Sequence, residues 1–241
     1  MKDNKKTKII YVFIYISLTM IMFGLLSFAY RHIMNSRQES LIEQIINIGD
    51  IEVNDRTALV RDAMKQNEDT VAWLEVPNTN INMPVVRAEN NEFYLYHNFQ
   101  KRRDSAGWAF ADFRNSFPDL NRNTIVFGHT FTGSRVVFTD LNRMLNEDWF
   151  EKEENHYLYL ATEQNEYKYR IFAVYTIAPV TDYMQISFRS NFEYEDFLNM
   201  LKNRSIQEFE TTINRRLPIL TLSTCTRGVN RLVVHAILQT S

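Results

Sequence analysis

The only cysteine of the 241-residue chain, Cys225, ends one apolar run, and Arg231 opens the next. The segment reads TLSTCTRGVNRLVVHAIL, in which Gly228 and Asn230 favour a tight turn between two strands. An antiparallel hairpin would set Cys225 and Arg231 nearly opposite each other at one end of a sheet. A guanidinium there would stabilise a thiolate and offer donors to a developing oxyanion. The alternative is that Cys225 is a small, inert core residue.

A cysteine nucleophile needs a group that handles protons, and in most such enzymes that group is a histidine. His129 is the best placed of the five histidines, because it follows the apolar run 124–127 and Gly128, where a strand is expected to end and expose its side chain. The others are not expected to take part in the chemistry: His32, His97, His156 and His235. Of these, His97 and His156 are predicted to be solvated, and His235 to be a hydrogen-bonded strand residue.

Residues 9–30 form a run of 22 residues without a charge. At about 1.5 Å per residue the run spans roughly 33 Å as a helix, enough to cross a hydrocarbon core. It is longer than the apolar region of a cleaved signal peptide, about 7–15 residues, and no small-x-small site follows it. We therefore predict a single-pass membrane anchor. The four lysines of residues 1–8 predict a cytoplasmic N-terminus. The chain after residue 30 is then expected on the extracellular face of the cell membrane.

The charge of the predicted outer part argues against some partners. Without the four Lys and one Asp of residues 1–8, the chain keeps 23 basic and 28 acidic residues, a net charge of −5. Nucleic-acid binding calls for a basic face, so no nucleic-acid partner is expected. This net charge also argues against docking on anionic lipid through overall charge alone. A single cysteine cannot form an internal disulfide, although the extracellular compartment would permit one.

Hydrophobic patterning divides the chain into four parts: a tail (1–8), the anchor (9–30), a helical lead-in (31–70) and one mainly-β domain (71–241). Turn residues and alternation within the last part predict short strands and one amphipathic helix. The predicted strands are 71–76, 80–87, 124–127, a hairpin around TEQNE, and the runs RLPILTLSTC and RLVVHAIL; the predicted helix is NFEYEDFLNMLKNRS.

These residues together resemble a sortase, a membrane-anchored cysteine transpeptidase of Gram-positive bacteria. The resemblance rests on TLSTC with an arginine opening the last strand, and on NTIVFGHTF about a hundred residues upstream. GWAFADFRNSF resembles the G-x-x-F-x-D-x-R stretch of class B sortases, and TDYMQISFRSNFEYEDFLNMLKNRS resembles the helix-bearing loop between strands six and seven of that class. The resemblance implies a closed eight-stranded β-barrel with N-terminal helices and a helix in that loop.

The resemblance also implies roles for individual residues. Cys225 matches the nucleophile, His129 the catalytic histidine and Arg231 the arginine of the family. The substrate groove of the family implies five binding candidates, for which barrel packing is the alternative: Leu95, Tyr183, Met184, Ser223 and Thr224. Asp112 is expected to be a structural partner of Arg114.

The chemistry that the resemblance implies is acyl transfer from a secreted surface protein or pilin with a C-terminal sorting motif. The acceptor would be an amine of a peptidoglycan precursor or a pilin lysine, so the product would be cell-wall anchoring or pilus assembly. No cofactor and no metal is expected.

Two other functions fit the residues. A membrane-anchored cysteine protease would transfer the acyl group to water. A non-catalytic surface scaffold domain would leave Cys225 buried and inert.

Overall fold

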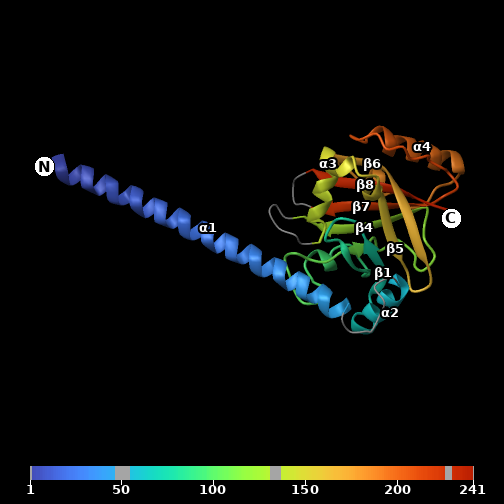
Figure 1. Cartoon of the computed structure of the whole chain (residues 1–241), viewed down its shortest axis with the longest axis horizontal. Helices are drawn as coiled ribbons and strands as arrows, with labels where there is room; N and C mark the ends of the chain where they lie inside the picture. The colour runs from blue at the N-terminus through green and yellow to red at the C-terminus, as the bar shows by residue number, and fades with distance from the viewer. Residues whose placement is uncertain (1, 47–54, 131–136, 226–229, 241) are drawn as a thin grey trace.

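A closed β-barrel of eight strands forms the body of the protein, and one long helix projects from it (Figure 1). The computed structural model describes residues 2–46, 55–130, 137–225 and 230–240. Around the barrel the strands follow the order β1–β2–β3–β4–β7–β8–β6–β5. The strands are β1 (Thr70–Glu75), β2 (Asn82–Val86), β3 (Phe110–Ala111), β4 (Asn123–His129), β5 (Tyr157–Ala161), β6 (Glu166–Ile177), β7 (Ile219–Cys225) and β8 (Arg231–Leu238). The predicted eight-stranded barrel is confirmed.

The long helix α1 (Lys2–Ile46) contains the uncharged run. Its residues Lys8–Ile33 have a mean hydropathy of 2.4 at the most apolar window, and none of that window is buried in the protein. Phe23 and Phe28, for example, are each 72% exposed. A core helix of a soluble protein buries such side chains, so α1 is not a core helix. Within the described residues, α1 is the one helix long and apolar enough to cross a membrane.

The second helix, α2 (Arg56–Gln66), is separate from α1 and packs on β1 (Figure 1). Its first turn is capped by Asp55, whose Oδ1 accepts a hydrogen bond from the Ala58 amide at 3.0 Å. The helix ends before residue 70 because Asn67 is extended and its side-chain amide donates to the Tyr94 hydroxyl at 2.9 Å. Residues 47–54 of the predicted lead-in lie outside the described residues.

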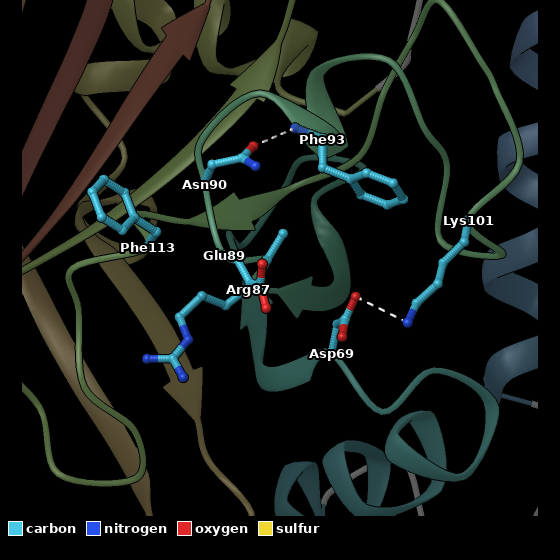
Figure 2. A pocket seen from close by; sticks show the side chains of 8 residues that line it. Asp69, Arg87, Glu89, Asn90, Phe93, Lys101 and Phe113 are labelled. Atoms are coloured by element: carbon cyan, nitrogen blue, oxygen red, sulfur yellow. Dashed lines mark hydrogen bonds and ion pairs between the residues drawn. The ribbon is translucent and has the colours of Figure 1, made fainter.

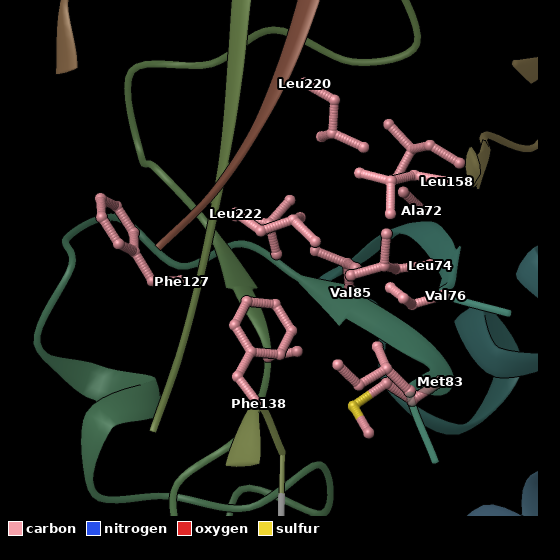
Figure 3. Close-up of a cluster of buried hydrophobic side chains, with 14 of the residues drawn as sticks. Ala72, Leu74, Val76, Met83, Val85, Phe127, Phe138, Leu158, Leu220 and Leu222 are labelled. Carbon is pink, nitrogen blue, oxygen red and sulfur yellow. The ribbon is translucent and has the colours of Figure 1, made fainter. Parts of the chain in front are cut away.

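The barrel interior is filled by aliphatic and aromatic side chains from facing strands (Figure 3). Leu74 and Val85 from β1 and β2 belong to the same cluster as Leu220 and Leu222 from β7, and Phe138 joins them. All five are completely buried. Because burial of one such side chain stabilises a fold by about 1.5–3 kcal/mol, β7 is firmly held at the place where it carries Cys225.

The fourth helix, α4 (Asn191–Asn203), lies in the connection between β6 and β7, as predicted for the helix-bearing loop (Figure 1). Ser190 begins it, since its hydroxyl accepts a hydrogen bond from the Glu193 amide at 3.1 Å. Its buried face, which includes Tyr194 and Leu198, packs on a second apolar cluster formed by β6, β7 and β8. The other connections carry short helical turns: η1 (Phe93–Leu95), η2 (Thr139–Leu145), α3 (Glu147–Phe150), η3 (Glu153–His156) and η4 (Asp182–Met184).

Candidate active site

The ends of β4 and β7 lie next to each other, because the two strands pair in parallel. His129 and Cys225 are the last pair of this ladder. The prediction that β4 ends before Gly128 is wrong: the strand continues through Gly128 to His129. A Cβ at Gly128 would lie 2.6 Å from Phe138 Cγ and 2.7 Å from Val137 Cγ1. Glycine therefore keeps the strand regular while the side chains of 137 and 138 pack against it.

Arg231 is the first residue of β8, which pairs with β7 in antiparallel register. Ser223 pairs with Val233, and the same register carried two residues further sets Arg231 opposite Cys225. The backbones of the three predicted catalytic residues thus lie at the same end of three adjacent strands, β4, β7 and β8. The side chain of Cys225 and the predicted turn residues 226–229 lie outside the described residues.

The ring of His129 is held by the η1 turn. Its Nε2 lies 2.9 Å from the carbonyl oxygen of Leu95. A carbonyl oxygen can only accept, so the geometry assigns the proton to Nε2. Behind this contact lies Gly107, whose φ is +62°. A Cβ there would lie 2.4 Å from the Tyr94 carbonyl oxygen, 2.9 Å from that of Leu95 and 3.1 Å from His129 Cδ2. The η1 carbonyl reaches the histidine because residue 107 has no side chain.

The guanidinium of Arg231 is half-buried and is oriented by the connection between β6 and β7. Its Nη1 donates to the hydroxyl of Tyr183 at 3.2 Å and to the carbonyl oxygen of Val180 at 3.5 Å. The Tyr183 hydroxyl also lies 2.9 Å from the Ser223 hydroxyl. The Nε of Arg231 is buried and has no hydrogen-bond partner among the described residues. A buried cationic donor without a partner is costly, and it is suited to an oxygen that develops negative charge.

The five candidates for substrate binding fall into two groups. Tyr183, Ser223 and Thr224 are fully buried, and Thr224 accepts a hydrogen bond from the Leu232 amide at 2.8 Å. Leu95 and Met184 are half-buried and so keep some surface. The three buried residues make their contacts within the barrel and its connections.

The turn η4, which carries Tyr183, is fixed from three sides. The side-chain amide of Asn123 donates to the carbonyl oxygens of Tyr183 and Gln185 at 3.2 Å and 2.9 Å. Arg114 donates to the Met184 carbonyl oxygen at 3.0 Å. A two-bond ion pair between Arg204 and Asp182, with distances of 2.9 Å and 2.6 Å, closes the third side. Through hydrogen bonding and charge, Arg204 lowers the pKa of Asp182.

Asp112 and Arg114 form the structural pair that the sequence predicts. Arg114 Nε donates to Asp112 Oδ1 and its Nη2 donates to Oδ2, both at 2.8 Å. Burial by itself would raise the pKa of Asp112, but the hydrogen bonds and charge of Arg114 outweigh that effect and the pKa is lowered. Because the same guanidinium binds Met184, this pair also supports η4.

Three of the other histidines are occupied by local contacts, and the fourth, His32, is exposed on α1. His235 is fully buried, and its two ring nitrogens lie 2.8 Å from the hydroxyls of Tyr175 and Thr221, as predicted for a bonded strand histidine. Burial, and then the charge of Arg204, lowers the pKa of His235 to about 3. The prediction of solvated rings for the two loop histidines is wrong. Both are half-buried and bond backbone carbonyls at 2.8 Å and 2.7 Å: His97 and His156.

A surface hollow of about 490 Å³ lies beside η1, whose Phe93 is part of its lining (Figure 2). Asp69, Arg87, Glu89 and Lys101 line it together with the rings of Phe93 and Phe113. Of the predicted catalytic residues whose side chains the structure describes, neither His129 nor Arg231 lines this hollow. The described residues contain no group of three or more His, Cys, Asp or Glu side chains that could hold a metal ion.

A comparison with known proteins decides the family. The sortase domain family matches residues 74–239. The chain belongs to the sortase family. This sortase is similar to Sortase B of Listeria monocytogenes, with 32% identity over 166 residues that cover 69% of this chain and 66% of that relative. The match therefore spans just under two thirds of the relative's length.

Solved structures support the same class. The sortase is similar to sortase B from B. anthracis in complex with AAEK1, with a TM-score of 0.76, 30% identity, and coverage of 86% of this chain and 98% of that chain. It is also similar to a sortase B complexed with triglycine, with a TM-score of 0.72, 25% identity, and coverage of 88% and 96%. These likenesses assign the chain to class B.

Sequence reasoning missed two positions that organise the site, Gly107 and Asn123. A glycine directly before an apolar run is a weak signal for a close backbone approach. Asn123 had a usable signal, since a buried asparagine at the start of an apolar strand must find partners for its amide.

Proposed function

We propose that this sortase is a membrane-anchored cysteine transpeptidase that cleaves a C-terminal sorting motif of secreted proteins and transfers the acyl group to an amine. The observation that carries the proposal is the pairing of His129 with Cys225 at the ends of β4 and β7, beside the first residue of β8, Arg231. Membership of the sortase family supports it, because cysteine transpeptidation is the chemistry of that family.

In the first half-reaction the Cys225 thiolate attacks the carbonyl carbon of the scissile peptide bond. A carbon–sulfur bond forms and the carbonyl oxygen becomes an oxyanion. The carbon–nitrogen bond then breaks as His129, as an imidazolium, gives a proton to the departing amine. The Leu95 carbonyl oxygen lies 2.9 Å from Nε2 and holds the ring in place for this transfer.

Arg231 stabilises the oxyanion in this scheme. Its Nη1 is tied to Tyr183, which fixes the plane of the guanidinium, and its Nε is the donor that has no partner among the described residues. A fixed donor is effective because it needs no reorganisation when negative charge appears. We assign Tyr183, Ser223 and Thr224 to the support of this donor, and Leu95 and Met184 to the wall of the substrate groove.

In the second half-reaction an amine attacks the thioester carbon and gives its proton to His129. The thiolate leaves, and a new amide bond joins the sorted protein to the acceptor. The likeness to a sortase B complexed with triglycine supports an amine of the glycine type, as in a peptidoglycan precursor. A pilin lysine is the other acceptor that the chemistry accommodates.

The position in the cell follows from α1. We propose that it crosses the cell membrane once, with residues 1–8 in the cytoplasm and the barrel outside. The four lysines before the span support this orientation. The substrate, a secreted protein, would then reach the barrel after it has been exported.

The test measures what attacks the thioester. The full chain, in detergent micelles, is incubated with a library of sorting-motif peptides, alone and with either triglycine or a lysine-bearing pilin fragment. We expect slow hydrolysis alone and a ligated product, identified by mass spectrometry, with one of the two amines. Rapid hydrolysis without a ligated product would instead indicate a protease.

The control is Cys225→Ala, which should give neither product and should melt at nearly the temperature of the unchanged chain. A thiol that reacts with a methanethiosulfonate reagent only in denaturant would support an inert scaffold and contradict the proposal.

A further inference from the structure

Residues 96–105 form a compact loop that is closed by backbone hydrogen bonds. The Asp104 amide donates to the Tyr96 carbonyl oxygen at 2.8 Å, and the Asn98 amide donates to that of Arg102 at 2.9 Å. This segment, which we name the 96–105 loop, directly follows η1, the turn that holds the His129 ring. These hydrogen bonds fix the backbone conformation of the loop.

The 96–105 loop contacts the long helix. The hydroxyl of Tyr30 in α1 lies 3.0 Å from the hydroxyl of Ser105. Tyr30 is the last residue of the uncharged run, and a run of that length just covers a hydrocarbon core of about 30 Å. Tyrosine at such a position lies at the level of the lipid head groups. If α1 crosses the membrane, the 96–105 loop is held at that same level.

The loop presents positive charge at this level. Its sequence includes Lys101, Arg102 and Arg103 in succession. Lys101 is already paired with Glu68 at 2.6 Å. It also pairs with Asp69 at 3.1 Å (Figure 2). Arg102 and Arg103 are exposed, and neither makes an ion pair with a residue that the structure describes. Two uncompensated guanidinium groups thus lie beside the point where α1 meets the loop.

Two further features suit a head-group layer. Tyr96, at the base of the loop, is 40% exposed, and aromatic side chains of this kind are enriched where one end is apolar and the other is wet. Arg31 and His32 follow Tyr30 on α1, and both are exposed. The net charge of −5 argued against lipid binding by the domain as a whole. This local basic surface is different because the anchor itself brings it to the membrane.

We propose that the 96–105 loop binds anionic lipid head groups of the membrane that α1 crosses, through Arg102 and Arg103. The proposal rests on the proposed anchoring by α1 and goes beyond the transpeptidase chemistry. It gives the barrel a second attachment point, so that η1 and the His129 contact keep a fixed height above the lipid. Each arginine near an anionic surface shifts such an equilibrium about five-fold, so removal of both lowers loop occupancy about 25-fold.

The experiment reads the distance between the loop and the head groups. The full chain with Cys225→Ala and Gln100→Cys carries one fluorophore in the loop, and Cys225→Ala with Asn199→Cys carries it on α4. Each is reconstituted into phosphatidylcholine vesicles that contain a nitroxide head-group quencher, with or without phosphatidylglycerol. Flotation with the vesicles reports anchoring separately, and amine transfer by the unlabelled chain reports the proposed function separately.

We expect strong quenching at position 100 only in vesicles with phosphatidylglycerol, with release of most of it at about 1 M salt, where the screening length falls to about 3 Å. Position 199 should remain unquenched. Arg102→Gln with Arg103→Gln should release the loop, while Lys202→Gln with Arg216→Gln, an equal charge change elsewhere on the barrel, should not.

Three results would overturn the proposal. Equal quenching with and without phosphatidylglycerol would mean that the contact with Tyr30 alone sets the height of the loop. Absence of quenching at position 100 in chains that float with the vesicles would mean that the loop lies away from the membrane. Quenching unchanged by the arginine pair, or lost equally in the Lys202 and Arg216 control, would remove the specific role of Arg102 and Arg103.

Discussion

At the scale of single residues, the candidate site depends on two polar contacts that orient His129 and Arg231. The Leu95 carbonyl oxygen is hydrogen-bonded to Nε2 of His129, and the Tyr183 hydroxyl accepts a hydrogen bond from Nη1 of Arg231. In both cases the partner that orients the ring or the guanidinium is an uncharged oxygen. A carboxylate in either place would have paired with the positive form and reduced its action on the substrate.

The orientation of Arg231 predicts a large effect of a conservative change. Arg231→Lys keeps the positive charge but loses the planar fork that binds Tyr183 and offers a second donor. We expect kcat/KM for peptide transfer to fall by at least about 10²-fold, the cost of one lost oxyanion donor. Arg216→Lys, at an exposed position, is the control and should retain activity. Near-normal activity of the Arg231 variant would leave only a simple charge effect.

The proposed roles of Cys225 and His129 predict a bell-shaped dependence of kcat/KM on pH. Thiolate and imidazolium must be present together, and they coexist only over an intermediate range. His129→Ala should remove nearly all activity at every pH, measured as transfer of a sorting-motif peptide. A variant that kept its activity and its bell-shaped profile would assign the role of general acid to another residue.

Residue types and spacing were sufficient to single out Cys225, His129 and Arg231 as candidates, because chemistry restricts which side chains can act together. They were not sufficient for the residues that support them. Tyr183 and Ser223 were predicted as binding candidates, and the structure finds both completely buried. The burial of these two side chains depends on the packing of η4 against β7, and a local sequence pattern does not predict such packing.

At the scale of elements, the segment from η1 to β3 is the support of His129. It leaves β2, forms the η1 turn, closes the 96–105 loop and returns through Gly107 to β3. The return requires a positive φ at residue 107 and an open space beside two carbonyl groups. A side chain at that single position would therefore move the turn that orients the ring.

Gly107→Ala tests this support. The new Cβ would collide with the carbonyls of Tyr94 and Leu95, and a non-glycine residue at this φ costs about 1–2 kcal/mol. We expect kcat to fall at least about ten-fold, with a narrowed pH profile and a smaller change in KM, because a misplaced ring delivers its proton poorly. Gly24→Ala, where nothing lies within 4 Å, is the matched control and should behave as the unchanged chain. A lower melting temperature with unchanged kcat would show that Gly107 serves stability alone.

Long periodic elements were predictable, and short ones were not. The alternation around TEQNE indicated the β5–β6 hairpin, and the apolar spacing of residues 191–203 indicated α4. The two-residue strand β3, with only Phe110 and Ala111, has no room for a period. The extension of β4 through Gly128 was missed because a glycine in a strand usually signals an irregularity, whereas here tertiary packing of Phe138 requires it.

At the scale of the whole molecule, the barrel contains a buried base that makes its stability depend on pH. His235 is bonded to Tyr175 and Thr221, and its pKa is lowered to about 3. An unfolded histidine has a pKa of about 6.5, so below that pH the unfolded chain takes up a proton that the folded chain does not. Stability due to His235 is complete above about pH 6.5 and is lost as the pH falls toward 3.

His235→Gln should therefore flatten the pH dependence of unfolding. We expect the free energy of unfolding of the unchanged chain to fall, relative to this variant, by up to about 1.4 kcal/mol per pH unit between about pH 6 and pH 4. The lowered pKa values of Asp112 and Asp182 act in the same direction in both proteins and cancel in the comparison. Thermal melting at a series of pH values measures the difference. His156→Gln, at a half-buried ring, is the control, and parallel curves for His235→Gln would contradict the prediction.

The strand order has a consequence for the timing of assembly. β7 and β8 are the last strands along the chain, yet they lie between β4 and β6 and close the wall of the barrel. If the segments after α1 are exported in sequence order, β1 to β6 would lie outside while the gap between β4 and β6 is still open. His129, on β4, would lie at one edge of that gap without its strand partner until the segment with Cys225 and Arg231 has been translocated. The proposed nucleophile would thus gain its partners only after β7 and β8 have been exported, and a chain exported only as far as β6 would have no complete site.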